Sequence, residues 1–287
     1  FLAGMNIEDL ELILQPMVEE AKEAVGSMGD DTPIAVLSDR YRPLSHFFRQ
    51  NFSQVTNPPI DSLRENEVMS LKTRFGNTGN ILDFENLTKD NIYVLESPVL
   101  SNAQFEKFSD FFKKNIRVLD CTFNINQSLK ERLDELRLEA EIAIREGGKH
   151  LILSDKAVKE NKVSIPMALA TGAVNSRLVN LGIRGFASIN VQSGEVLDTH
   201  SFAVLLGVGA TTINSYIAFD SIYQRYEKGL FGKLSFEAES LVENVKAFTE
   251  AIMRAKPAST KGQFVNKCVL SSAMGPGIKI DRSQLAA

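Results

Sequence analysis

IRVLDCTFNINQSLKERLDELRLEAEIAIREGGKHLILSD, residues 116–155, decides the fold. The segments 116–123 and 150–155 are expected to form strands, the second of them buried with a polar end at Ser154 and Asp155. The segment 128–148 between them has the apolar spacing of an amphipathic helix, and it ends in a Gly-Gly pair. A strand, a helix and a second strand in this order are typical of a crossover within a parallel sheet.

The same alternation continues on both sides of this stretch. Upstream, a strand at 91–100 and a helix at 101–114 precede the strand 116–123. Downstream, helical and strand patterns alternate from Ile165 to the helix that begins near Ser215, and the strands end in small polar residues. We therefore expect an α/β fold with a mostly parallel sheet, flanking helices and repeated β/α units. Ligands and partners of such sheets meet the carboxyl ends of the strands.

Weaker patterns precede this region. Residues 6–25 predict a helix with Asn6 as its N-cap and a kink at Pro16, and TPIAVLSD, residues 32–39, predicts a short buried strand. A second helical stripe is expected in HFFRQNFSQV, and Asp61 is placed to cap a further helix.

Composition narrows the classes of function. The 287-residue chain has a net charge of -4, which argues against a nucleic-acid surface over its whole length. It has no apolar run of about 18–20 residues and an acidic rather than basic N-terminal segment, so we expect a cytoplasmic protein without membrane contact. Cys121 and Cys268 are interpreted as reduced thiols. Residues 242–287 differ from the rest: seven Lys or Arg against three acids give this tail a net charge of +4.

Short motifs favour structure over catalysis. GSMGDD (26–31) and GVGATT (207–212) lack a complete phosphate-binding pattern and are interpreted as a helix end with a turn and as close helix packing. The histidines His46, His150 and His200 form no recognisable triad motif, and Cys121 has no basic neighbour in sequence.

Longer strings carry a resemblance to a family. Residues 26–82, together with HLILSD, IPMALATGAV and THSFAVLLGVGATTINSYIAFDSI, resemble the central domain of the large subunit of glutamate synthase, from about residue 1 to 232. The resemblance implies a subunit that converts glutamine and 2-oxoglutarate to two glutamates. A glutaminase domain would release ammonia, and a synthase domain with FMN and an iron-sulfur cluster would use it.

By this resemblance the chain is a non-catalytic connector, inactive when isolated, between the glutaminase and FMN synthase domains. Two cysteines cannot ligate a cluster alone, so no cofactor is expected in this chain. The expected interdomain face lies within 26–33 and 54–66 and comprises Gly26, Ser27, Met28, Gly29, Asp30, Asp31, Thr56, Asn57, Pro58 and Pro59. Asn175 stands where the family usually has His, which matters only if the position binds a ligand.

The tail resembles a different family. Residues 232–281 are similar to the C-terminus of ribosomal protein L-one, which predicts domains at 1–232 and 233–287, a chimera joined near residue 232, and a terminal helix and hairpin of VNKCVL with GIKID. In that family a Thr-Met-Gly turn contacts ribosomal RNA. The corresponding residues here are Ala273, Met274 and Gly275, so weak, salt-sensitive RNA binding is the alternative function. A free-standing enzyme that uses His200 or the pair Asp30 and Asp31 is a third hypothesis.

Overall fold

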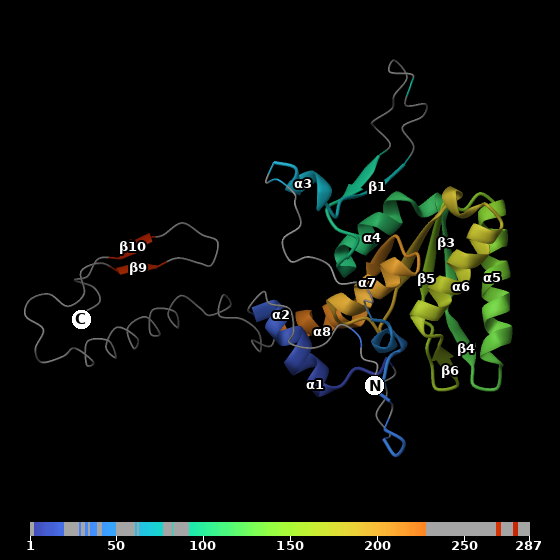
Figure 1. Cartoon of the computed structure of the whole chain (residues 1–287), viewed down its shortest axis with the longest axis horizontal. Coiled ribbons are helices and arrows are strands. Elements are labelled where there is room, and N and C mark those ends of the chain that lie inside the picture. Colours follow the sequence, from blue (N-terminus) through green and yellow to red (C-terminus); the bar gives the residue numbers. More distant parts are fainter. Residues whose placement is uncertain are drawn as a thin grey trace, which may run out of the picture. The chain divides into compact units, whose positions relative to one another are not determined.

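The computed structural model describes residues 3–19, 29, 32–33, 35–38, 42–49, 61, 63–76, 82 and 92–227, and the strands 268–270 and 278–280. The chain divides into two compact units, Phe1–Lys228 and Gly229–Ala287, which are considered separately (Figure 1).

A four-stranded parallel sheet forms the centre of the first unit. Its strands are β3 (Ile116–Asp120), β5 (His150–Ser154), β7 (Ser188–Gln192) and β8 (Thr212–Asn214), which lie side by side in that order. The helices α5 (Leu129–Arg145), α6 (Met167–Asn180) and α7 (Thr199–Gly207) connect successive strands, and α8 (Tyr216–Glu227) follows β8. The α/β class and the mostly parallel sheet expected from the sequence are confirmed.

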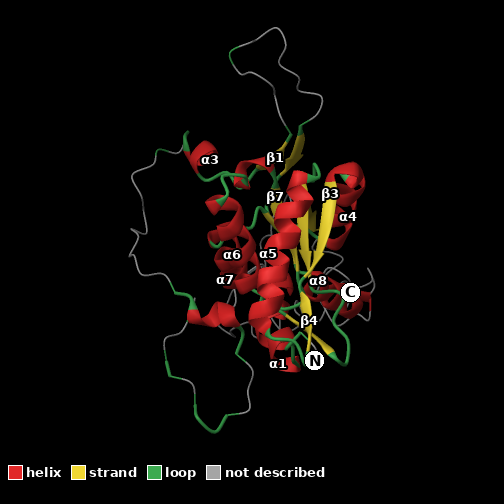
Figure 2. Ribbon diagram, turned by 90° about the vertical axis from the view of Figure 1, so that its right-hand side faces the viewer, coloured by secondary structure: helices red, strands yellow, loops and turns green. Residues whose placement is uncertain are grey.

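Both faces of the sheet are covered. In Figures 1 and 2, α5 and α6 lie on one side of the strands and α4 (Asn102–Phe111) lies on the other. The main core joins α5, α6 and α7 to side chains of all four strands. All five residues of β5 are buried, which explains why the three central residues, Leu151, Ile152 and Leu153, are all apolar.

A smaller aromatic core lies on the α4 side. Phe105, Phe108 and Phe112 pack there against Phe75 and Leu95, which belong to the antiparallel pair β1 (Thr73–Phe75) and β2 (Tyr93–Leu95). The aromatic packing thus holds this pair of strands against the sheet.

The expectation for residues 91–100 was right about a strand, β2, and about the helix that follows it, α4, but wrong about the sheet to which the strand belongs. These residues do not form a parallel neighbour of β3, because β2 pairs with β1 instead. After β2, only Val99 makes a parallel bridge, and its partner is Ile213 of β8, the edge strand opposite β3. Pro98 carries no amide hydrogen, so a strand cannot continue through it with regular hydrogen bonds.

The strand expected at 32–39 was also wrong for the residues described. Ser38 N donates to the carbonyl of Ala35 in a turn, and Val36 and Leu37 are 95% and 97% exposed. The apolar residues Val36 and Leu37 are therefore exposed to solvent and do not form a buried strand.

The N-terminal helix follows the expectation more closely. It comprises α1 (Ile7–Asp9), the π-helical turn η1 (Leu10–Leu14) and α2 (Gln15–Glu19), and Asn6 caps it by accepting a hydrogen bond from Asp9 N. The wide turn directly precedes Pro16, whose nitrogen has no hydrogen for an α-helical bond. Residues 20–25 lie outside the described part.

Short elements complete the first unit. Of the described residues in the second stripe (46–55), His46 and Phe47 lie in a 3₁₀ turn, η2 (Leu44–Phe47), whereas Phe48 and Arg49 are not helical; residues 50–55 lie outside the described part. The 3₁₀ turns η3 (Lys113–Asn115) and η4 (Arg184–Phe186) precede β3 and β7. The side chain of Asp61 accepts from Leu63 N and Arg64 N in the turn before α3 (Glu65–Val68), but the N-cap of that helix is Arg64, so Asp61 does not occupy the capping position predicted for it. β4 (Thr122–Asn124) pairs antiparallel with β6 (Lys162–Ser164).

In the second unit, β9 (Cys268–Leu270) pairs antiparallel with β10 (Ile278–Ile280), so the predicted hairpin strands are confirmed. The terminal helix and the turn that contains Ala273, Met274 and Gly275 lie outside the described residues.

Candidate functional site

Polar residues gather at the carboxyl ends of the parallel strands, where the sequence places a ligand or partner. Asp120, Ser154, Gln192 and Asn214 occupy matching positions at the ends of β3, β5, β7 and β8. The fold therefore brings together side chains that are almost 100 residues apart in sequence.

Asp155, directly after β5, is the most buried acid at this edge, at 4% exposure. Its carboxylate accepts hydrogen bonds from Ser193 Oγ at 2.7 Å, from Gly194 N at 3.0 Å and from the Tyr216 hydroxyl. Burial raises the pKa of Asp155, and the hydrogen bonds oppose that rise without cancelling it. Burial, followed by the charge of Asp155, also raises the pKa of Tyr216.

Amides and hydroxyls fill the rest of the edge. Ser154 Oγ donates to Gln192 Oε1 at 3.1 Å, and Gln192 Nε2 donates to Asn214 Oδ1 at 3.3 Å. Asn214 Nδ2 donates in turn to Leu100 O and to Asn102 Oδ1. The described polar groups at this edge are thus bonded to one another, an arrangement that stabilises the sheet and leaves few donors or acceptors for a ligand.

Glu195 adds a second carboxylate near this edge. Its Oε1 accepts a hydrogen bond of 2.7 Å from Met167 N, so it caps the amino end of α6. Burial raises the pKa of Glu195 to about 7, the bond from Met167 opposes the rise, and the charge of Asp155 adds to it. Sequence reasoning missed this role; the signal was an acid just after the polar end of a strand.

The three histidines have structural surroundings. His150 is buried, its Nδ1 lies 2.8 Å from Ser188 Oγ, and burial followed by the charge of Lys149 lowers its pKa to about 4. His200 is also buried, and its Nε2 bonds to the Ser45 carbonyl at 2.8 Å. Burial is the main cause of a lowered pKa at His46. None of them, within the described residues, hydrogen-bonds an acid and a nucleophile together, which is the geometry of a triad.

Cys121 is a core residue. It is fully buried, its Sγ contacts the Leu119 carbonyl at 3.7 Å, and burial raises its thiol pKa, which disfavours the reactive thiolate. In the part of the chain described, no three His, Cys, Asp or Glu residues are grouped to hold a metal ion. Together with the count of two cysteines, this arrangement does not fit an iron-sulfur cluster.

One residue of the expected interdomain face is described. Gly29 has a φ of +90°, and a Cβ there would lie 2.0 Å from the Phe48 carbonyl oxygen. Only glycine suits this turn because it meets the backbone of another segment. Gly26, Ser27, Met28, Asp30, Asp31, Thr56, Asn57, Pro58 and Pro59 lie outside the described residues.

Asn175 packs rather than standing open to a ligand. Its Oδ1 accepts a 2.8 Å bond from Arg184 Nε, and its Cγ lies 2.3 Å from the position of a Cβ at Gly209, whose φ is +117°. The GVGATT segment therefore packs closely against α6, which confirms the structural interpretation of that motif.

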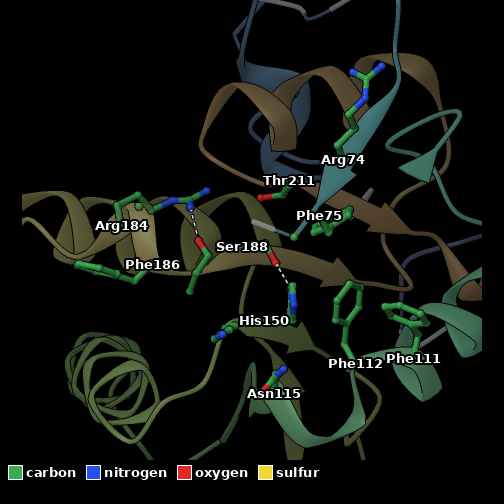
Figure 3. Close-up of a pocket in the computed structure, with 14 residues that line it drawn as sticks. Arg74, Phe75, Phe111, Phe112, Asn115, His150, Arg184, Phe186, Ser188 and Thr211 are labelled. Carbon is green, nitrogen blue, oxygen red and sulfur yellow. Dashed lines mark hydrogen bonds between the residues drawn. The ribbon is translucent and has the colours of Figure 1, made fainter. Parts of the chain in front are cut away.

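A pocket of about 1000 Å³ lies at the opposite, amino ends of the strands (Figure 3). It is bounded by the hairpin β1–β2, the end of α4 and the segments that enter β5, β7 and β8. The sequence did not predict this pocket.

No helix in the described part of the chain is both long and apolar enough to cross a bilayer.

Comparison with known proteins gives a consistent family. The sequence model of the family "Glutamate synthase central domain" matches residues 1–260. The match extends past residue 232, the position at which we expected the resemblance to change from one family to another. The chain is 52% identical over 254 residues to the glutamate synthase [NADPH] large chain of Azospirillum brasilense and 38% identical over 253 residues to that of Bacillus subtilis (strain 168), 88% of this chain in each case. It is 34% identical over 280 residues, 95% of the chain, to the chloroplastic ferredoxin-dependent glutamate synthase of Spinacia oleracea.

The matched segment makes up only 17%, 16% and 17% of these three relatives, so most of each relative has no counterpart here. The identity and the length of the family match nevertheless leave no ambiguity about kinship: this chain belongs to the glutamate synthase central-domain family.

Proposed function

We propose that the larger unit of this chain is a non-catalytic connecting domain of a cytoplasmic glutamate synthase. In the complete subunit it bridges a glutaminase domain and an FMN synthase domain, and that subunit converts glutamine and 2-oxoglutarate to two glutamates. FMN and the iron-sulfur cluster belong to the other domains.

The observation that carries the proposal is the hydrogen-bonded edge at the carboxyl ends of the strands. In open parallel sheets this edge is the usual place for a ligand. Here Asp155 is bonded to Ser193, Gly194 and Tyr216, and Asn214 is bonded to the segment before α4. The polar groups of this edge are already hydrogen-bonded within the chain, which supports a rigid scaffold better than an active site.

The expected contact face with the synthase domain, within residues 26–33 and 54–66, remains part of the proposal. The left-handed Gly29 supports it, because its close approach to Phe48 fixes the course of the backbone there.

An activity assay of the isolated 287-residue chain tests the non-catalytic role. With glutamine, 2-oxoglutarate and a reductant, we expect neither ammonia release nor glutamate formation above the background without protein. Turnover that disappears in His200→Ala would instead support the free-standing enzyme.

RNA binding by residues 233–287 is the second candidate. Its support is the net charge of +4 over residues 242–287 and the paired strands β9 and β10, between which Ala273, Met274 and Gly275 lie in the sequence. Filter binding to stalk-site ribosomal RNA at two salt concentrations tests this candidate. A net charge of +4 can neutralise only a few phosphates, so we expect weak binding that is lost as salt is added. Tight, sequence-specific binding would make RNA recognition the primary function. A separate experiment, sequencing of the source locus across codons 225–245, would test whether two genes are joined near residue 232.

A further inference from the structure

The pocket at the amino ends of the strands has a concentration of positive charge. Three of its 14 lining residues are cations, Arg74, Lys149 and Arg184, and none is an acid. The chain as a whole carries a net charge of -4, so this excess is local. Cations in a concave site raise the local concentration of anions, because low-dielectric walls focus their field.

Arg184 is held in a fixed position at one side of this pocket. Its Nε donates to Asn175 Oδ1 at 2.8 Å, and its two terminal nitrogens donate to the carbonyls of Ala187 at 2.6 Å and Gly209 at 2.9 Å. All three acceptors are neutral oxygens. Burial lowers the pKa of Arg184, since none of its bonds offsets the cost of placing a charge there.

A guanidinium has five N–H donors, and three of those of Arg184 are engaged by these bonds. The remaining two make no hydrogen bond with a described residue and can bond an oxyanion, and the three existing bonds keep the group oriented before that anion arrives. Lys149 and Arg74 are exposed, and neither side chain forms a hydrogen bond or ion pair with another described residue.

Aromatic rings form the apolar part of the same pocket. Phe75 and Phe112 are almost fully buried in its wall, whereas Phe111 and Phe186 are 57% and 70% exposed. Figure 3 shows Phe111 and Phe112 together at one side and Phe186 with Arg184 at the other. Such faces suit a flat, apolar body, which packs against aromatic rings in offset or edge-to-face geometry.

We propose that this pocket binds a small planar organic anion, an aromatic ring that carries a carboxylate or a phosphate. Arg184, Lys149 and Arg74 take the oxyanion, and the phenylalanine rings take the flat body. The site is separate from the filled edge at the carboxyl ends of the strands, and the inference does not depend on the connecting function proposed above.

Isothermal titration calorimetry of the full 287-residue chain tests this site. The probes are benzene-1,3-dicarboxylate and phenyl phosphate, with acetate as an oxyanion without a ring and benzamide as a ring without charge, all at equal ionic strength. We expect both aromatic anions to bind with dissociation constants of about 1 mM or lower, more weakly as salt is added, and both controls to bind at least about tenfold more weakly. The stronger of the two probes identifies the preferred oxyanion.

Variants locate the binding. Arg74→Gln with Lys149→Gln removes two cations whose exposed side chains support no described contact, so folding is retained and affinity falls about tenfold. Lys130→Gln, an exposed cation in the first turn of α5, makes the same kind of charge change away from the pocket and leaves affinity unchanged. Absence of binding to either aromatic anion would overturn the proposal, as would equal binding of acetate or an undiminished affinity in the double variant.

Discussion

The carboxylate of Asp155 accepts a hydrogen bond of 2.7 Å from the hydroxyl of Ser193, and this bond joins the residue after β5 to the residue after β7. It closes the edge of the sheet at which a ligand would otherwise be expected. Two stretches of chain 38 residues apart thus depend on one buried acid.

Replacement of Asp155 should therefore cost stability. Asp155→Ala leaves the Ser193 hydroxyl and the Gly194 amide buried without their acceptor, and we expect a loss of about 2–4 kcal/mol in the free energy of unfolding. Urea denaturation measures it. Asp134→Ala is the matched control, because the side chain of Asp134 bonds, among the described residues, to Arg137 alone, in an exposed ion pair worth about 0.2–1 kcal/mol. Equal losses in the two variants would refute the structural role of Asp155.

Glu195 predicts a pH dependence of stability. Its pKa is raised from 4.5 to about 7, so between these values the folded chain keeps a proton that the unfolded chain has released. Stability therefore falls as pH rises through this window, and the contribution of Glu195 amounts to about 1–3 kcal/mol.

Glu195→Gln isolates this effect, because its amide oxygen still accepts the bond from Met167 N while the side chain no longer titrates. We expect the stability of the wild-type chain relative to the variant to fall by about 1–3 kcal/mol between about pH 4.5 and about pH 8, as urea midpoints at each pH would show. A constant difference between the two proteins would mean that Glu195 ionises normally.

Gly209 predicts a steric requirement. Gly209→Ala places a Cβ 2.3 Å from Asn175 Cγ in a backbone with φ of +117°, and we expect a loss of about 2–3 kcal/mol. Gly207→Ala, two residues earlier, meets nothing within 4 Å and should be neutral or slightly stabilising. Thermal unfolding of the pair makes the comparison, and a tolerated alanine at 209 would contradict the packing of this turn against α6.

Two phenylalanines of α4 should differ sharply. Phe108 is fully buried, with its ring 5.0 Å from that of Phe75 and 5.1 Å from that of Phe112, and Phe108→Ala should cost about 3–5 kcal/mol. Phe111 is 57% exposed, and Phe111→Ala should cost only about 1 kcal/mol. If both changes have similar effects on urea denaturation, the aromatic core does not hold the hairpin β1–β2 in place.

The sequence predicted those elements whose local pattern agrees with their environment. Leu151, Ile152 and Leu153 are apolar because both faces of β5 are buried, and the stripe of residues 128–148 matches the buried face of α5. The strand expected at 32–39 failed because Val36 and Leu37 are exposed in a turn. The strand expected at 91–100 is present as β2, but its place in the parallel sheet was wrong, because the pairing of β2 with β1 depends on tertiary contacts that no short pattern encodes.

The sites show the same division. The polar strand ends at Ser154, Asp155 and Gln192 predicted where polar groups would gather, since parallel strands align their carboxyl ends. The residue types alone do not show that these groups form hydrogen bonds with each other. The pocket is lined by three cations that are far apart in sequence, Arg74, Lys149 and Arg184. The register of the sheet and the position of β1 and β2 bring them together, so no short sequence motif predicts the pocket.

The most direct measurement replaces the matching segment of the Azospirillum brasilense large chain with the 88% of this chain that aligns with it, and follows glutamate formed and free ammonia released from glutamine and 2-oxoglutarate. A connecting domain that is 52% identical over this segment should restore glutamate formation with little free ammonia, whereas a large chain without the segment should not form glutamate. A replaced enzyme that releases all its ammonia without forming glutamate, although it folds, would contradict the connecting function.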